Sequence, residues 1–415
     1  MKEAKKILVL AETIDVDTSS AGRTNLGMIH SLLATGCDIE VFHYSNKPIV
    51  IPQVKVHHIR TLKTDINFWL SRFQRVLQRL LKRNFSRFIE NRRGFSFTFS
   101  NDVASMVKAI ERNIETAHLI ITLSKGASYR THAALLKLPG VHEKWLAYIH
   151  DPYPFHWYPK PYDWLEAGSD FKEEFILEVA QRAKWIGYPS LKLQEWMAQY
   201  DSQFETKGVI MPHQTVPVKV KTALPVFFTM SKFNILHAGN LMKQRPPFTL
   251  LEGFQLFLDR CPEAQKDSCL LLIGTASYHE AALEDYKKQM PNVVIKTRNL
   301  PFNAVYNMQQ VASVNIILEA DAAKSPFLPG KFPHCLAASK PIFYIGPEDS
   351  ETRRLLGKEY LYLATVDNAE KISEIIEKLY LEWKSENQFD TTIYNNLNHY
   401  FSTAYIKDKI DKLIS

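Results

Sequence analysis

The sequence lacks several features that would mark a metal-binding or membrane-spanning protein. Its four cysteines, Cys37, Cys261, Cys269 and Cys335, stand far apart except for one interval of eight residues, and they show no CxxC or Cys/His spacing. This pattern is typical of reduced cytosolic thiols and predicts no metal site. No segment approaches the eighteen consecutive apolar residues that a membrane-spanning helix needs. A GxGxxG motif is also missing, so a dinucleotide-binding interpretation has little support.

A signal peptide is not indicated either. The lysines near Met1 are followed by only a short apolar run, from Ile7 to Ala11, which is too short for the apolar region of a secretory leader. We therefore expect a cytoplasmic protein. What the chain does contain is 46% hydrophobic and 12% aromatic residues over 415 positions, without low-complexity tracts. Such a composition predicts a packed globular protein of two or three domains.

Short apolar runs recur along the chain, with helical patterns between them. Continuous runs of this kind are typical of parallel strands that are buried on both faces. They cover residues 6–11, 38–42, 117–123, 144–149, 184–188 and 208–212, and then 233–237, 269–273, 293–295, 314–318, 341–345 and 360–363. Alternation of strand and helix predicts the α/β class with doubly wound sheets.

The stretch between the two sets of runs has no periodicity and contains Pro217 and Pro225, which is typical of a linker. We predict a first domain over 1–215, a linker over 216–232 and a second domain over 233–390. The closing helices, 391–415, are expected to pack back on the first domain.

The most informative stretch of the chain surrounds Lys331. It follows the apolar run 314–318, so it lies at the carboxyl end of a predicted parallel strand, where open α/β sheets bind ligands. Pro329 and Gly330 predict a turn, and Lys331 falls at or near the first position of a short helix. Backbone N–H groups and one ammonium at a helix start favour anion binding, so we expect a ligand that carries phosphate.

These residues resemble the C-terminal nucleotide-sugar domain of GT-B glycosyltransferases, in particular the family-four-like group. The matching positions are Pro329, Gly330, Lys331, Leu336, Ala337, Lys340, Pro341 and Ile342. Two positions depart from the family pattern, because His334 stands where the family has Glu and Ser339 where it has Gly. That Glu holds the ribose hydroxyls of the donor, so the departure at His334 puts ribose binding in doubt.

The resemblance implies further site residues in both halves. The first turn of the second half matches a Gly-x-Leu pattern followed by a cation, and Arg245 or Lys243 corresponds to the group that clamps the β-phosphate. In the first half, His150 ends a predicted strand and is followed by Asp151, as in relatives whose His lies beside the donor sugar. The implied donor-binding residues are Gly22, Arg23, Gly239, Asn240, Lys243, Gly274, Pro329, Gly330 and His334. Gly22 and Arg23 are equally compatible with an ordinary turn.

The resemblance implies a retaining GT-B glycosyltransferase with two Rossmann-like domains, of the kind that serves polysaccharide biosynthesis. Its donor would be a nucleotide-diphospho-sugar, for which we predict UDP, and its acceptor a glycan or a lipid-linked sugar. No cofactor or metal is expected. The predicted catalytic residues are His150, Arg245 and Lys331, of which the two cations would neutralise the departing diphosphate.

Two other functions remain open at this stage. A catalytically silent nucleotide-binding protein would agree with His334 and with Phe327, which stands eight residues after Glu319 where the family has a second Glu. A nucleotide-sugar epimerase of the same architecture is the other alternative. For an active enzyme, neutral His334 is expected to hold one ribose hydroxyl, because neutral imidazole has one acceptor. Glu348 or Glu351 could replace it.

Positive charge is concentrated in one segment of the first half. Eight arginines and lysines stand against Glu90 between positions 67 and 93, among apolar residues at intervals of three and four. This pattern predicts a basic amphipathic helix. The apolar stripe of 68–93 either packs on its own domain or contacts an anionic membrane. Nucleic acid is not expected, since no known binding module accompanies the patch.

Overall fold

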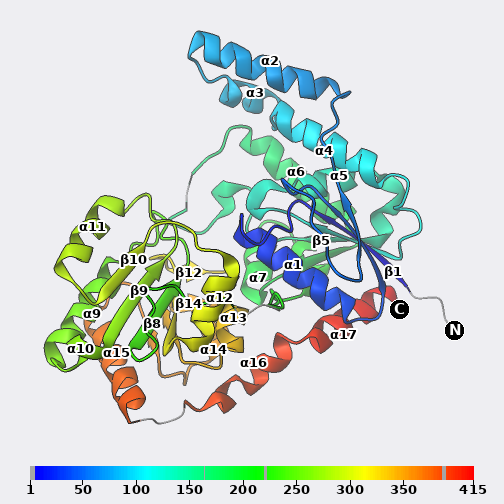
Figure 1. The fold of residues 1–415 in the computed structure, drawn as a ribbon. Coiled ribbons are helices and arrows are strands. Elements are labelled where there is room, and N and C mark those ends of the chain that lie inside the picture. Colours follow the sequence, from blue (N-terminus) through cyan, green and yellow to red (C-terminus); the bar gives the residue numbers. More distant parts are fainter. Residues whose placement is uncertain (1–4, 163, 219–221, 386–388) are drawn as a thin grey trace. The chain divides into compact units, whose positions relative to one another are not determined.

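The computed structural model describes residues 5–162, 164–218, 222–385 and 389–415. Parts of the predicted linker 216–232 and of the predicted second domain 233–390, namely 219–221 and 386–388, lie outside the described residues. The chain divides into two compact units (Figure 1). The first contains the residues up to Tyr158, Tyr162–Val216 and Ser402–Ser415, and the second contains Pro159–Pro161 and Pro217–Phe401.

The first unit is built on a seven-stranded parallel sheet of order β3-β2-β1-β4-β5-β6-β7. The strand order reverses between β1 and β4, which is where open α/β sheets form their ligand crevices. The strands are β1 (Lys6–Ala11), β2 (Asp38–His43), β3 (Lys55–His58), β4 (Leu119–Leu123), β5 (Trp145–Tyr148), β6 (Trp185–Tyr188) and β7 (Gly208–Ile210). The helices are α1 (Ser20–Leu33), α2 (Ile66–Leu81), α3 (Ser86–Arg93), α4 (Phe97–Ile110), α5 (Arg130–Leu136), α6 (Ser169–Arg182), α7 (Leu191–Ala198), α8 (Gln203–Thr206) and α17 (Thr403–Ile414).

Alternation along the strands gives this sheet a hydrophobic core on each face. On β1, Ile7 and Val9 belong to the core that contains α1 and α17, whereas Leu8 and Leu10 belong to the core that contains α4, α5 and α6. Because successive side chains of a strand point to opposite faces, a continuous apolar run satisfies both cores. The predicted strands of the first half are present and mostly buried, except that the run 208–212 forms only the short edge strand β7, whose three residues are half-buried.

The second unit has a six-stranded parallel sheet of order β10-β9-β8-β11-β13-β15, the order of a dinucleotide-fold sheet. Its strands are β8 (Phe233–Ala238), β9 (Ser268–Ile273), β10 (Val293–Lys296), β11 (Val314–Leu318), β13 (Ile342–Ile345) and β15 (Leu363–Ala364), with a separate pair β12 (Lys324–Ser325) and β14 (Asp349–Ser350). The helices are α9 (Phe248–Arg260), α10 (Ala264–Asp267), α11 (Glu280–Gln289), α12 (Phe302–Val311), α13 (Phe332–Ala337), α14 (Glu351–Leu356), α15 (Ala369–Lys384) and α16 (Asn395–Tyr400).

Helices cover both faces of this second sheet as well. One core joins β8, β9 and β11 to α9 and α15, through residues such as Ile235, Phe254 and Ile376. On the other face, α12 and α13 pack through Met308 and Leu336. The predicted doubly wound architecture is thus present in both units.

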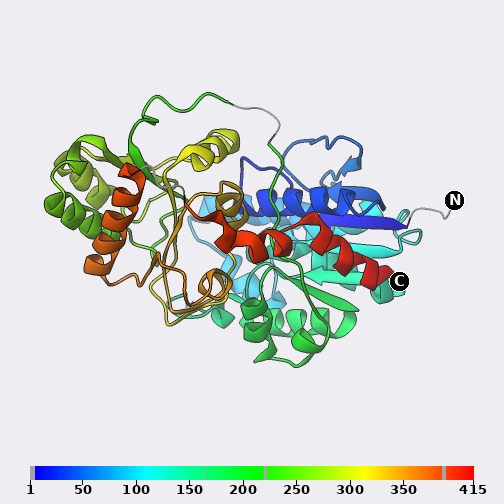
Figure 2. The same ribbon diagram turned by 90° about the horizontal axis from the view of Figure 1, so that it is seen from below.

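The closing helices divide between the units. Tyr394 and Leu397, at the start of and within α16, pack in a core of the second unit. Ile406 and Ile410 of α17 pack in the first unit against α1, and α17 is the red helix that ends at the mark C in Figures 1 and 2. Of the segment 391–415, only the part from Ser402 onward therefore packs with the first unit.

Two local predictions need correction, and one strand was missed. The basic segment 68–93 forms two helices, α2 and α3, because Lys82 adopts a left-handed conformation with φ of 50° that ends α2. The last strand lies at Leu363–Ala364 rather than over 360–363, since the Tyr360 hydroxyl accepts a hydrogen bond from the Ile342 amide. The edge strand β3 was not predicted, because its half-buried residues form no apolar run.

Candidate nucleotide-sugar site

In the second unit, three predicted residues meet where the strand order reverses. Gly239 follows β8 and Gly274 follows β9, and a Cβ on Gly274 would lie 2.3 Å from the Gly239 carbonyl oxygen. Gly274 also has a φ of +148°, so both this backbone conformation and the close approach to Gly239 require glycine there. A Cβ on Gly239 would lie 3.4 Å from the Lys331 ammonium. Asn240 supports the same turn, because its side-chain oxygen accepts a hydrogen bond from the Thr275 amide at 3.3 Å.

The ammonium of Lys331 is held between two strands. It lies 3.0 Å from Nδ1 of His237 on β8, and it donates to the carbonyl oxygen of Ile316 on β11 at 3.0 Å. Burial, assisted by the nearby charge of Arg245, lowers the pKa of Lys331 to about 7. Burial also lowers the pKa of His237 well below its usual range, and the Lys331 charge acts in the same direction. His237 was not predicted as a site residue, because it stands at the end of an ordinary apolar run, 233–237, that was interpreted only as a strand.

Arg245 supplies a second cation close to Lys331. Its charge contributes to the lowered pKa of both Lys331 and His237, so it lies in the same electrostatic environment. The Nε of Arg245 is buried and has no hydrogen-bond partner among the described residues. A buried guanidinium nitrogen without a partner favours an anionic ligand, because leaving it unmatched is costly. Lys243, the other predicted cation of this turn, is exposed.

A buried carboxyl group, Glu319, follows β11 beside these cations. It accepts hydrogen bonds from the Ser325 hydroxyl and, at 2.7 Å, from the Thr352 hydroxyl. Burial raises the pKa of Glu319, while Arg245 and Lys331 oppose that rise. Glu319 thereby ties β12 and α14 to the sheet edge. The contacts of Glu319 were not predicted, and only the family comparison drew attention to this residue, because its hydroxyl partners lie six and 33 positions away.

The turn at Pro329 and Gly330 has the predicted form. The Pro329 carbonyl accepts from the Phe332 amide at 2.8 Å, and α13 begins at Phe332 with Lys331 as the preceding cap residue. His334 lies in this helix with its ring edge-on to Phe302 and Tyr306 of α12, at 5.4 and 5.8 Å between ring centroids. His334 is buried.

The two carboxylates that could replace His334 have different surroundings. Glu351 is fully buried and makes two hydrogen bonds with Arg354, at 2.7 and 2.9 Å, so its carboxylate is already engaged. Glu348 remains exposed and lies 3.7 Å from Arg353. Of the two, only Glu348 is accessible to a ligand.

In the first unit, Gly22 and Arg23 belong to the first turn of α1. A Cβ on Gly22 would lie 2.0 Å from the Asp15 carbonyl oxygen, so the loop after β1 can pass α1 only with glycine at this place. Ser19 caps the helix by accepting from the Gly22 amide at 3.1 Å. Arg23 donates to the Val16 carbonyl at 3.1 Å, and burial lowers its pKa. Both residues therefore shape this loop.

His150 lies two residues beyond β5, at the carboxyl edge of the first sheet. Its ring is stacked on His213 at 5.7 Å and meets Tyr148 edge-on at 4.7 Å. Burial lowers the pKa of His150 well below its ordinary value, and His213 and His132 add to the shift. The Nε2 atom is buried and has no hydrogen-bond partner in the described part of the chain. Burial also raises the pKa of the neighbouring Asp151 to about 6.

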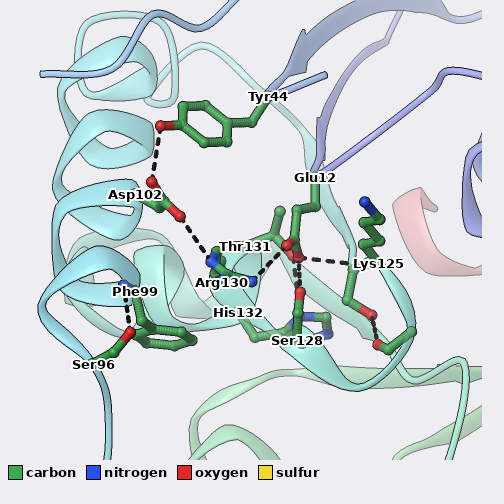
Figure 3. A network of polar contacts seen from close by, with 12 residues as sticks. Glu12, Tyr44, Ser96, Phe99, Asp102, Lys125, Ser128, Arg130, Thr131 and His132 are labelled. Atoms are coloured by element: carbon green, nitrogen blue, oxygen red, sulfur yellow. Dashed lines mark hydrogen bonds and ion pairs between the residues drawn. The ribbon is translucent and has the colours of Figure 1, made fainter. Parts of the chain in front are cut away.

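A polar network, shown in Figure 3, braces the same edge where the strand order reverses. Arg130, which begins α5, donates to Glu12 after β1 at 2.9 Å and to Asp102 of α4 at 3.0 Å. Tyr44 donates to the other Asp102 oxygen at 2.9 Å, and Ser128 donates to Glu12. The network fixes the loops that follow β1, β2 and β4. It was not predicted, because Glu12 and Arg130 are 118 positions apart.

The described residues contain neither a candidate metal cluster nor a candidate membrane-spanning helix. Within the ranges that the structure describes, no group of three or more His, Cys, Asp or Glu side chains is arranged to hold a metal ion. No helix in those same ranges is long and apolar enough to cross a membrane.

Solved structures with the same architecture are numerous. A trehalose-6-phosphate synthase from Burkholderia multivorans has a TM-score of 0.66 at 11% identity, covering 99% of this chain and 96% of its own. HepE from Anabaena, solved with UDP and glucose, has a TM-score of 0.60 at 11% identity and covers 98% of each chain. A UDP-forming trehalose-phosphate synthase from Burkholderia xenovorans, solved with glucose-6-phosphate, has a TM-score of 0.65 at 10% identity, covering 99% and 100%.

These likenesses establish the fold. The chain has the two-unit α/β architecture of GT-B glycosyltransferases, as the resemblance implied. No protein-family model matches the sequence, and no curated protein matches it either.

Proposed function

We propose that the chain is a metal-independent glycosyltransferase that transfers a sugar from a UDP-sugar to a glycan or a lipid-linked acceptor in the cytoplasm, with retention at the anomeric carbon. The observation that carries the proposal is the cationic cluster at the reversal point of the second sheet. Lys331 and Arg245 lie there beside two glycines that leave the backbone open to a ligand. A nucleoside diphosphate matches this chemistry, because its charge would complement both cations.

The same cluster accounts for the chemical step. The bond between the anomeric carbon and the β-phosphate oxygen breaks while a new bond forms between that carbon and the acceptor oxygen. Negative charge develops on the departing UDP, where Lys331 and Arg245 would stabilise it. On the retaining route, the departing phosphate takes the acceptor proton, so no separate side-chain base is needed. His150 is the proposed sugar-side residue, because its Nε2 is left without a partner.

Donor binding and turnover together test this function. Calorimetry with UDP and UDP-sugars should show binding by the native chain, and Lys331→Ala or Arg245→Ala should lower turnover by about 2–4 kcal/mol in transition-state free energy. Lys287→Ala is the control, since this exposed cation of α11 is not among the implied site residues. If Lys331→Ala leaves both UDP affinity and turnover unchanged, the assignment of the diphosphate site is wrong.

A nucleotide-binding protein without transferase activity is the second candidate. It is favoured by His334, which packs against Phe302 and Tyr306 where the family pattern has a carboxylate. Tight UDP binding without turnover on any acceptor would support it, whereas conversion of the sugar without an acceptor would indicate an epimerase. His334→Glu separates the alternatives further, because a regained ribose contact should raise UDP affinity.

A lipid-linked acceptor would additionally require contact with a bilayer, for which residues 68–93 are the candidate surface.

A further inference from the structure

Helix α2 packs on the first unit through a side that is largely polar but also carries Phe68, which is buried, and Leu70 and Leu77, which are half-buried. Ser71 is buried, and Gln74 and Gln78 are half-buried. These three side chains follow one another at intervals of three and four residues, so they share one face of the helix. Gln74 donates to the Ser86 hydroxyl of α3 at 3.1 Å. The segment that leads into α2 is anchored on α4, where Asn101 donates to the Leu62 carbonyl.

The opposite face of α2 is apolar and exposed. It carries Ile66, Trp69, Phe73, Val76 and Leu80, whose exposed fractions range from 55% to 73%. Each of the last four positions follows the one before at an interval of three or four, so the five side chains form a continuous stripe over the helix. Phe73 and Val76 stand two residues from Ser71 and Gln78, which is a rotation of about 200° on a helix. We call these five residues the α2 stripe.

The five apolar side chains of the α2 stripe are thus exposed to solvent, whereas an amphipathic helix ordinarily packs its apolar side on its own domain. Amphipathic helices of the same chain behave in the ordinary way, since α17 buries Ile406 and Ile410 and α15 buries Ile372 and Ile376. Figure 1 shows α2 and α3 as the outermost layer beyond α4. For the segment 68–93, the prediction that the apolar residues pack on their own domain is therefore wrong for the α2 stripe, although Phe68 of the same helix is buried.

On α2, an arginine directly precedes each of three stripe residues, Phe73, Val76 and Leu80, so cations flank the stripe along one side. Arg72, Arg75 and Arg79 are exposed on α2, and five more cations follow up to Arg93. Together with the single acid Glu90, these eight cations account for the whole formal net charge of +7 of the chain. Glu90 is already engaged with Lys172, at 3.6 Å. Among the described residues, none of the eight forms an ion pair, so their charge is available to an external partner.

We propose that the α2 stripe and its flanking cations form a docking surface for an anionic lipid bilayer. An apolar stripe with Trp and Phe, flanked by arginines, suits a helix that lies in the plane of a membrane surface with its apolar side among the acyl chains. A second copy of the chain is a poorer occupant, because it would bring the same cations against these and like charges repel. The docking surface stands independently of the proposed transferase activity.

Vesicle co-sedimentation tests the surface without any need for turnover. At low salt, the native chain should bind vesicles of phosphatidylcholine and phosphatidylglycerol at least about ten-fold more tightly than phosphatidylcholine alone. High salt should weaken this binding, because it screens surface charge. The double variant Arg72→Gln, Arg79→Gln should lose about five-fold in affinity per charge. Trp69→Ser with Phe73→Ser should lose at least about ten-fold, and both variants should fold because all four side chains are exposed.

Matched controls lie on the second unit. Leu361 is as exposed as Trp69, so Leu361→Ser removes a comparable apolar side chain away from the stripe. Lys287→Gln with Lys288→Gln removes two exposed cations of α11. Both controls should bind vesicles as the native chain does. Equal losses of vesicle affinity in the control and stripe variants would overturn the proposal. So would a native chain that binds charged and uncharged vesicles equally well, or that binds neither at low salt.

A direct contact readout uses Trp69. In vesicles whose acyl chains are brominated, Trp69 fluorescence should be quenched on binding, and Trp69→Phe should remove most of that quenching while keeping the apolar surface. Light scattering on the same proteins gives the oligomeric state. A native dimer that Trp69→Ser with Phe73→Ser converts to a monomer, without vesicle binding, would show that a second copy covers the stripe and would refute the bilayer.

Discussion

The protonation state of the Lys331 amine should depend on whether a phosphate ligand is bound. Its pKa is lowered to about 7 in the free chain by burial, so above that pH the amine is mostly neutral. A bound diphosphate would favour the ammonium form and raise this pKa. Binding above pH 7 therefore takes up a proton, and UDP affinity should fall as pH rises, by up to about ten-fold per pH unit.

Calorimetry near pH 8 in two buffers of different ionisation enthalpy measures this uptake. The expected result is close to one proton per UDP bound, to which UDP contributes little because a terminal phosphate titrates at roughly pH 6. Lys331→Arg is the control, since a guanidinium stays charged at this pH and should take up no proton. Equal proton uptake by the native chain and Lys331→Arg would remove Lys331 as the titrating group.

Ser339 holds a conformation that explains the glycine of the family pattern. Its φ is +52°, in the left-handed region, just after α13. An L-residue there is strained by about 1–2 kcal/mol, whereas glycine is not strained but has more entropy to lose on folding. Ser339→Gly should therefore stabilise the second unit by about 0.5–1 kcal/mol.

Thermal unfolding of Ser339→Gly measures this gain as a raised Tm. Ser385→Gly is the matched control, because Ser385 also follows a helix and is exposed but has a negative φ of −78°. That control should be destabilised. A lower Tm for Ser339→Gly would show that the serine side chain contributes more than its backbone strain removes.

Among the elements, α5 is joined to β1 and α4 by one guanidinium. Arg130 stands between the carboxylates of Glu12 and Asp102, and its side chain is 25% exposed. Arg130→Met would leave two buried or half-buried carboxylates without their cation, which we expect to destabilise the first unit by about 3 kcal/mol. The pKa of Asp102 is already raised by burial, against the effect of Arg130, and should rise further in the variant.

Urea unfolding at two pH values checks this prediction. Because a carboxyl group with a raised folded-state pKa favours folding in its protonated form, the deficit of Arg130→Met should shrink as pH falls from about 7 to about 5. Adding Glu12→Gln to Arg130→Met should recover part of the stability, since it removes one uncompensated charge. A deficit that is independent of pH and unaffected by Glu12→Gln would mean that lost packing, and not charge, is its cause.

The elements also show how far a sequence can predict this fold. Strands such as β4 and β11 were predicted to within two residues, because a parallel strand buried on both faces is a continuous apolar run. The turn at Lys331 was predicted because Pro and Gly act locally. The break at Lys82 was not, since no Gly or Pro marks it. His237 and the Arg130 network escaped prediction because their partners are distant in the chain, at separations of 94 and 118 residues.

At the scale of the whole molecule, the chain returns to its first unit at its end. Ile406 and Ile410 of α17 are fully buried in the core that also contains Met28, Ile29 and Leu32 of α1. Lys407 adds a hydrogen bond to the Thr35 carbonyl at 3.0 Å. The first unit is therefore incomplete until residues 402–415 are in place, although the second unit precedes them in the sequence.

Removal of this contact should destabilise one unit selectively. Ile406→Ala with Ile410→Ala is expected to cost the first unit about 2–4 kcal/mol per substitution, through lost burial and the cavities left behind. Amide hydrogen exchange should then show faster exchange in α1, while α9 of the second unit keeps its protection, because exchange reports local stability. Leu381→Ala on the exposed side of α15 is the control and should stay within about 0.5 kcal/mol of the native chain. Unchanged protection of α1, or an equal loss in α9, would show that α17 does not stabilise the first unit in this way.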